Sequence, residues 1–140
     1  MTGYLPTMPH ATGEFDVKLN PLPTFAPESA DGPPLGRMSL DKVFRGDLEG
    51  TSKGEMLTAG STVKGSAAYV ALERVTGTLH GKTGSFALYH TGVMNRGDGA
   101  LSVVVAPDSA TGELSGLAGE MQIIVGGGKH SYEFRYQLAE

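Results

Sequence analysis

The sequence predicts an all-β protein that forms a single eight-stranded antiparallel β-barrel. Glycine makes up 21 of the 140 residues, about twice its usual share of roughly 7%, which favours many strands joined by short turns. No window carries an apolar stripe at helical spacing, and only residues 57–63 and 109–117 leave room for a helical turn. Consecutive strands must close into a barrel or split into a sandwich, because an exposed edge strand invites aggregation.

The predicted strands follow one another with short connections between most of them. In residues 12–19, apolar Phe15, Val17 and Leu19 alternate with charged residues, the period of two typical of a half-buried strand. The connections at 95–99 and 126–129 supply Asn and Gly residues, which tolerate the positive φ of tight hairpins. The other predicted strands are 37–45, 48–59, 66–75, 82–95, 100–107, 119–125 and 130–138.

Two segments lie outside this pattern. Residues 1–10 contain two prolines and no periodicity, so we expect an N-terminal arm followed by one domain over 11–140. Residues 20–36 hold five prolines, and proline can neither donate to a β-ladder nor sit inside a helix. This segment is therefore a long loop, either a binding loop or lid or a plain surface excursion.

A Gly-x-Leu-x-Gly pattern occurs three times, at residues 46–50, 77–81 and 112–116. A further glycine follows each copy, at Gly54, Gly84 and Gly119. Glycine within a strand marks a bulge, a sharp bend or a close approach of two backbones. We expect the copies to mark the same corner of the barrel and the third strand to carry a bulge. No Lys-Ser/Thr pair follows, which disfavours a phosphate-binding loop.

Composition excludes several classes of protein. The chain has no cysteine, which rules out disulfides, thiolate nucleophiles and Cys-ligated metals, and no cofactor is predicted. The net charge is -4 and the basic residues are scattered, so we expect no nucleic-acid partner. The first ten residues lack a signal-peptide pattern, and no apolar run approaches the roughly 20 residues that span a bilayer. We expect a cytoplasmic protein without a membrane partner.

Several polar side chains are predicted to point into the barrel. In residues 130–138, His130 and Tyr132 share a face with three aromatic or apolar residues. In residues 82–95, His90 shares a face with Phe86 and Leu88. These groups need hydrogen-bond partners if they are buried.

The register of residues 66–75 stays open, so either Glu73 or Arg74 joins the interior. Convergence of such groups in an apolar barrel is the usual sign of a ligand site, although core side chains that satisfy one another would give the same pattern. The histidines lack metal-binding spacing, and no metal site is predicted. The candidate ligand-binding residues are His90, His130, Tyr132, Glu73, Arg74 and Tyr69.

A family resemblance supports the barrel. The segments GDLEGTSKGEML from Gly46, YVALERVTGTLHGKTGSFALYHTGVM from Tyr69, SATGELSGLAGEMQI from Ser109 and HSYEFRYQL from His130 together resemble an uncharacterised bacterial family, a domain of unknown function. Its members are similar to small barrels related to allene oxide cyclase. The resemblance implies an allene oxide cyclase-like or lipocalin-like fold and no established activity. Allene oxide cyclase steers a fatty-acid epoxide in an apolar cavity, which implies a cavity for something small and apolar here.

The leading hypothesis is a barrel that binds a small, partly apolar molecule in its interior. One alternative is a cofactor-free isomerase or cyclase that uses Glu73 or a histidine as a general base on a lipid-like substrate. The other is a structural or interaction protein with a filled barrel. A homodimer or other homo-oligomer is compatible with each of these hypotheses.

Overall fold

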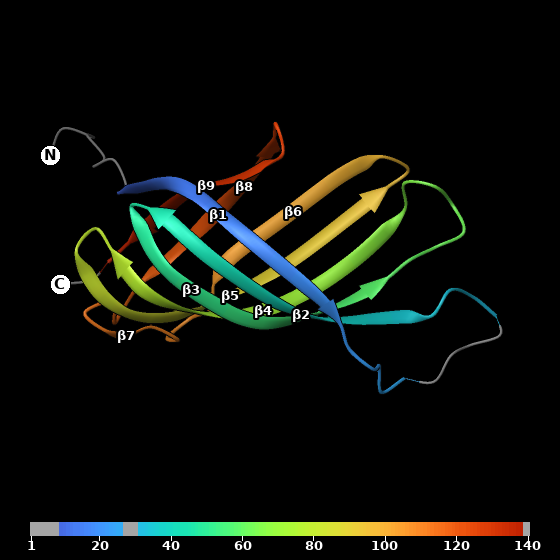
Figure 1. The fold of residues 1–140 in the computed structure, drawn as a ribbon, viewed down its shortest axis with the longest axis horizontal. Helices are drawn as coiled ribbons and strands as arrows, with labels where there is room; N and C mark the ends of the chain where they lie inside the picture. Colours follow the sequence, from blue (N-terminus) through green and yellow to red (C-terminus); the bar gives the residue numbers. More distant parts are fainter. Residues whose placement is uncertain (1–8, 27–30, 139–140) are drawn as a thin grey trace, which may run out of the picture.

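The computed structural model describes residues 9–26 and 31–138 and confirms the all-β prediction. The chain forms a closed eight-stranded antiparallel barrel with one short extra strand outside it (Figure 1). The described residues contain no helix, and so none that is long and apolar enough to cross a membrane. The strands are β1 (His10–Pro21), β2 (Leu35–Gly46), β3 (Leu48–Ala59), β4 (Ala67–Leu79), β5 (Lys82–Asn95), β6 (Asp98–Val105), β7 (Thr111–Gly112), β8 (Ala118–Gly126) and β9 (Lys129–Gln137).

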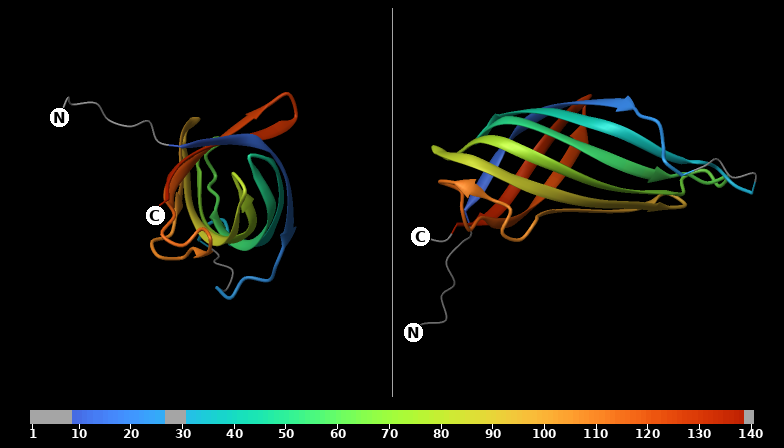
Figure 2. Two further views of the ribbon diagram at one scale, coloured as in Figure 1. Left: turned by 90° about the vertical axis from the view of Figure 1, so that its left-hand side faces the viewer. Right: turned by 90° about the horizontal axis from the view of Figure 1, so that it is seen from below.

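The barrel closes through a simple strand order. The order β4-β3-β2-β1-β9-β8-β6-β5 is completed by pairing of β4 with β5, and β7 pairs with β5 outside this ring. Viewed along the barrel, the strands form a closed ring (Figure 2, left). The pairing between β6 and β8 is short, since the ladder between these strands consists of the pair Val104 and Glu120.

The strands lie close to their predicted positions, and the two at 48–59 and 82–95 match residue for residue. The third strand carries no bulge, because β3 pairs without interruption with both β2 and β4. Residues 109–117 form β7 and a series of hydrogen-bonded turns without a helix, and residues 57–59 belong to β3. His10 begins β1 and is not part of an arm, while residues 1–8 lie outside the described residues.

One end of the barrel is filled with apolar side chains. This closed end carries the β2–β3 and β4–β5 hairpins, at the left of Figure 1. The rings of Phe86 and Phe134 stack there with their centroids 5.9 Å apart, and Leu48, Leu79 and Leu114 are fully buried. The opposite, open end carries the β3–β4 connection and the β5–β6 hairpin.

The glycines of the repeated pattern meet one another at the closed end, as predicted. Gly50 pairs with Gly77 between β3 and β4, and Gly84 pairs with Gly112 between β5 and β7. A Cβ atom at Gly50 would lie 2.3 Å from the carbonyl oxygen of Thr76 and 2.8 Å from the Cα atom of Gly77. These glycines therefore allow neighbouring backbones to approach more closely than any side chain permits.

The Gly50→Ala substitution should lower the free energy of unfolding by about 1 to 3 kcal/mol, because the added methyl group has to push backbone atoms apart. Urea unfolding measures the loss. Gly126→Ala is the matched control, since a Cβ atom at Gly126 meets no atom within 4 Å. Equal stabilities of the two variants would contradict this account of the repeat.

Candidate functional site

The register of β4 places Glu73 inside the barrel and Arg74 outside it. Glu73 alternates with buried Ala71 and Val75 and is 2% exposed. Arg74 is exposed, and its guanidinium lies 3.4 Å from the hydroxyl of Ser85 on the outer face. The prediction of Arg74 as an interior alternative is therefore wrong, because the apolar neighbours of Glu73 are the ones that fill the core.

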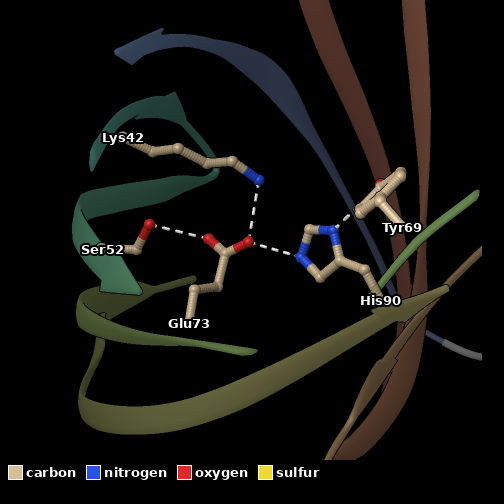
Figure 3. Close-up of polar contacts among 5 residues, drawn as sticks. All are labelled: Lys42, Ser52, Tyr69, Glu73 and His90. Atoms are coloured by element: carbon tan, nitrogen blue, oxygen red, sulfur yellow. Dashed lines mark hydrogen bonds and ion pairs between the residues drawn. The ribbon is translucent and has the colours of Figure 1, made fainter. Parts of the chain in front are cut away.

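The Glu73 carboxylate is the centre of a buried polar network, defined here as Lys42, Ser52, Tyr69, Glu73 and His90 (Figure 3). Its Oε1 atom accepts a hydrogen bond of 2.7 Å from the Ser52 hydroxyl. Its Oε2 atom accepts from Lys42 Nζ at 2.9 Å and from His90 Nε2 at 2.5 Å. The side chains of Lys42, Glu73 and His90 are between 0% and 4% exposed, so these bonds form away from water.

A glycine leaves space beside Glu73, and aromatic rings stabilise the Lys42 ammonium. Gly54 pairs with Glu73, and a Cβ atom at Gly54 would lie 2.6 Å from the Glu73 Cα atom. The Lys42 ammonium lies 4.8 Å from the centroid of the Phe15 ring and 5.8 Å from that of Phe44. The faces of aromatic rings attract a cation, so they offset part of the loss of hydration of Lys42.

Glu73 is ionised within this network. Burial alone would raise its pKa, but the hydrogen bond from His90 and the positive charge of Lys42 outweigh burial and lower the pKa from 4.5 to about 2. Lys42 and ionised Glu73 therefore form a buried ion pair whose charges cancel. Among the described residues, every buried side-chain nitrogen and oxygen atom has a hydrogen-bond partner.

His90 connects this ion pair to Tyr69. The carboxylate of Glu73 accepts a hydrogen bond from His90 Nε2, so Nε2 carries a proton and the other ring nitrogen, Nδ1, faces Tyr69. The Tyr69 hydroxyl lies 3.5 Å from Nδ1, and the two rings meet edge to face with centroids 6.3 Å apart. Burial and the negative charge of Glu73 raise the pKa of Tyr69, which keeps the phenol protonated.

Tyr69 also lines a cavity at the open end of the barrel. This mouth cavity has a volume of about 570 Å³. A Cβ atom at Gly92 would lie 2.2 Å from Cε1 of Tyr69, so the absence of a side chain at Gly92 lets the Tyr69 ring lie across β5. The inward-pointing side chains around the cavity include Met56, Thr58, Tyr69, Met94 and Leu101.

Two other predicted site residues lie elsewhere. The Tyr132 hydroxyl donates to the carbonyl oxygen of Arg45 at 2.9 Å and accepts from the backbone N–H of Leu48 at 2.9 Å, which ties β9 to the β2–β3 hairpin. The partly buried ring of His130 packs on Phe15 with centroids 5.2 Å apart. The prediction of a single cluster is therefore wrong for Tyr132 and His130, although both point inward as expected.

The sequence reasoning missed Lys42 and Ser52. The signal for Lys42 was present, because Lys42 alternates with Leu40 and Phe44 on the inward face of β2. A second polar contact was also missed, between His80 Nδ1 and the hydroxyl of Tyr136 at 2.5 Å in the β4–β5 hairpin region. Among the described residues, no group of three or more His, Asp or Glu side chains is arranged to hold a metal ion.

The fold and sequence match proteins whose function is unknown. Residues 11–136 match a protein family, DUF3224, which is described as a protein of unknown function. A crystal structure of a protein with unknown function from the same family, from Shewanella oneidensis MR-1, has 49% sequence identity and a TM-score of 0.90. The alignment covers 95% of this chain and 98% of that one. No curated protein matches the chain.

Glu73→Gln should lower the free energy of unfolding by about 3 to 5 kcal/mol, because it leaves the Lys42 ammonium buried without a counter-charge. Denaturant unfolding measures the loss. Glu55→Gln is the control: Glu55 pairs with Arg37 on the surface, and such pairs contribute about 0 to 1 kcal/mol. Adding Lys42→Met to Glu73→Gln should recover most of the loss. A single-variant loss as small as that of the control would contradict the role of the pair.

Acid should remove the same stabilisation. The pKa of Glu73 is lower in the folded protein, at about 2, than its ordinary value of 4.5. Its contribution is therefore fully present above pH 4.5 and decreases as the pH falls toward 2. The difference in unfolding free energy between the wild type and Glu73→Gln should narrow over this range, as urea titrations at a series of pH values would show. A constant difference would mean that Glu73 does not ionise in the folded state.

Proposed function

The chain belongs to the DUF3224 family of unknown function, and we propose from the geometry of its barrel that it binds a small, partly apolar molecule in the mouth cavity. The polar end of this molecule lies against the Tyr69 hydroxyl, and its apolar part extends toward the open end of the barrel. His90, Glu73 and Lys42 act behind Tyr69 and hold it in position. Tyr132 and His130 take no part in this binding.

The observation that carries the proposal is an apolar cavity with one phenol at the edge of a buried polar network. Its volume of about 570 Å³ falls within the roughly 300 to 1,000 Å³ typical of small-molecule sites. Eight-stranded barrels are wide enough to hold one small ligand when side chains do not fill them. Met56 and Met94 in the wall have flexible side chains that adapt to ligands of different shape.

The charge balance of the site favours a ligand with a neutral polar group. The charges of Lys42 and Glu73 cancel, and both groups lie behind His90 and Tyr69. A carboxylate in the cavity would lose its hydration without meeting a free cation among the inward-pointing wall residues. An alcohol or a ketone needs one hydrogen bond, which the Tyr69 hydroxyl provides as a donor to a carbonyl or as an acceptor from a hydroxyl.

The same geometry weighs against catalysis by Glu73. The resemblance to allene oxide cyclase suggests a cofactor-free isomerase or cyclase, which would need a general base. Glu73 has a pKa of about 2, and both of its oxygens already accept hydrogen bonds. It is therefore a weak base, and three hydrogen-bond donors already occupy its two oxygens. A purely structural barrel is also less favoured, because its open end is hollow.

Calorimetric titration with 1-octanol and octanoate tests this proposal. We expect 1-octanol to bind more tightly than octanoate, and Tyr69→Phe to weaken its binding by roughly 2- to 10-fold through loss of one hydrogen bond. Tyr89→Phe changes a tyrosine on the outer face and should leave the affinity unchanged. Leu101→Trp, which narrows the cavity, should abolish binding. Tighter binding of octanoate, or equal affinities of the wild type and Tyr69→Phe, would refute the proposed site.

A further inference from the structure

Large apolar side chains form a continuous patch on the outside of the barrel, over β2 to β5. The register makes the patch continuous, because Leu57 pairs with Val70 and Leu72 pairs with Tyr89 across neighbouring strands. The side chains of this outer apolar face are between 40% and 60% exposed. They are Leu35, Leu57, Val70, Leu72 and Tyr89.

The outward positions on the other side of the barrel are mostly charged or polar. On β1 they include Glu14, Asp16 and Lys18, and on β9 they include Glu133 and Arg135. The exposed apolar residues are therefore concentrated over β2 to β5. A concentrated apolar patch on a protein surface marks a site of interaction.

The outer apolar face is also hollowed. A groove of about 700 Å³ lies between it and the segment after β1, which includes Phe25. This segment is fixed to β2, because the backbone N–H of Leu22 donates to the carbonyl oxygen of Arg37 at 2.8 Å. The Arg37 guanidinium in turn donates to the carbonyl oxygen of Pro23 at 3.1 Å. The Phe25 side chain is nevertheless fully exposed at the edge of the groove.

We propose that two copies of the chain form a dimer through this face, with Phe25 of each copy inserted into the groove of the other. An interface with two-fold symmetry needs complementary features on one surface, because the same patch contributes twice. A projecting phenyl ring beside a groove of suitable chemistry meets this requirement. An exposed aromatic ring that enters an apolar groove is also the kind of residue that dominates binding energy at interfaces.

Charge further favours a second copy over a charged partner. The charged residues that line the groove are Arg37 and Glu55, and they pair with each other at 2.7 Å. Among the described residues, the lining of the groove therefore offers no unpaired charge that would attract a strongly acidic or basic protein. Two identical faces of this kind meet without repulsion. The dimer leaves the barrel interior free, so this proposal does not depend on the proposed ligand.

Sedimentation analysis of the full chain, over a wide range of concentrations, tests the dimer. We expect the wild type to sediment at twice the chain mass, and Leu72→Glu to raise the dissociation constant at least roughly 30-fold. Phe25→Ser should also raise the dissociation constant of the dimer. Ile124→Glu is the matched control: Ile124 is 51% exposed on β8, and this variant should remain dimeric. Circular dichroism spectra identical to that of the wild type would show that the variants fold.

Three results would overturn the proposal. A wild type that is monomeric at every concentration would show that the chain does not form the dimer. A Leu72→Glu variant that remains dimeric would show that the interface lies elsewhere. A monomer that binds the apolar dye bis-ANS, with binding lost in Leu72→Glu, would assign the face to an occupant other than a second copy.

Introduced cysteines give an independent readout of the geometry, because the chain has none of its own. In a mixture of Phe25→Cys and Leu57→Cys chains, we expect mild oxidation to link the two variants by a disulfide. A mixture of Phe25→Cys and Ile124→Cys chains is the control and should not form this cross-link. Equal linkage in both mixtures would contradict insertion of Phe25 into the groove.

Discussion

The buried ion pair between Lys42 and Glu73 is the constraint on which the interior of this barrel depends. A charge removed from water destabilises the fold by several kcal/mol unless a partner is held close to it. Lys42 on β2 and Glu73 on β4 meet across β3, where Gly54 leaves the space beside Glu73 empty of a side chain. The pair therefore fixes the positions of β2, β3 and β4 relative to one another along the barrel axis. A shift of any of them by one residue would separate the charges or expose them.

This constraint divides the barrel into three layers. Aromatic and aliphatic side chains fill the closed end, and the polar network crosses the middle. The open end holds a cavity of about 570 Å³. Because His90 is bound to Glu73 on one side, its other ring nitrogen points toward Tyr69, which forms the boundary between the network and the cavity (Figure 3). A buried charge pair at the centre of the barrel thus positions the neutral hydroxyl of Tyr69 at the edge of the cavity.

The alternation of apolar and polar residues predicted the barrel and the inward direction of His90, because both depend on a period of two. Alternation assigns a side chain to a face but not to a height along the barrel. Tyr132 and His130 were therefore grouped with His90, although Tyr132 lies at the β2–β3 hairpin. The choice between Glu73 and Arg74 needed the pairing register, which local sequence does not contain. The two-residue strand β7 is too short to show any period.

Nuclear magnetic resonance of the His90 ring nitrogens tests the central claim most directly, which is that a molecule in the mouth cavity contacts the polar network through Tyr69. In the free protein, the account predicts a proton on Nε2 that is hydrogen-bonded to the Glu73 carboxylate. Addition of 1-octanol should shift the Nδ1 signal, since the Tyr69 hydroxyl turns toward the ligand, while the His130 signals stay in place. An unchanged His90 signal with 1-octanol bound, or the same shift in Tyr69→Phe, would contradict the account.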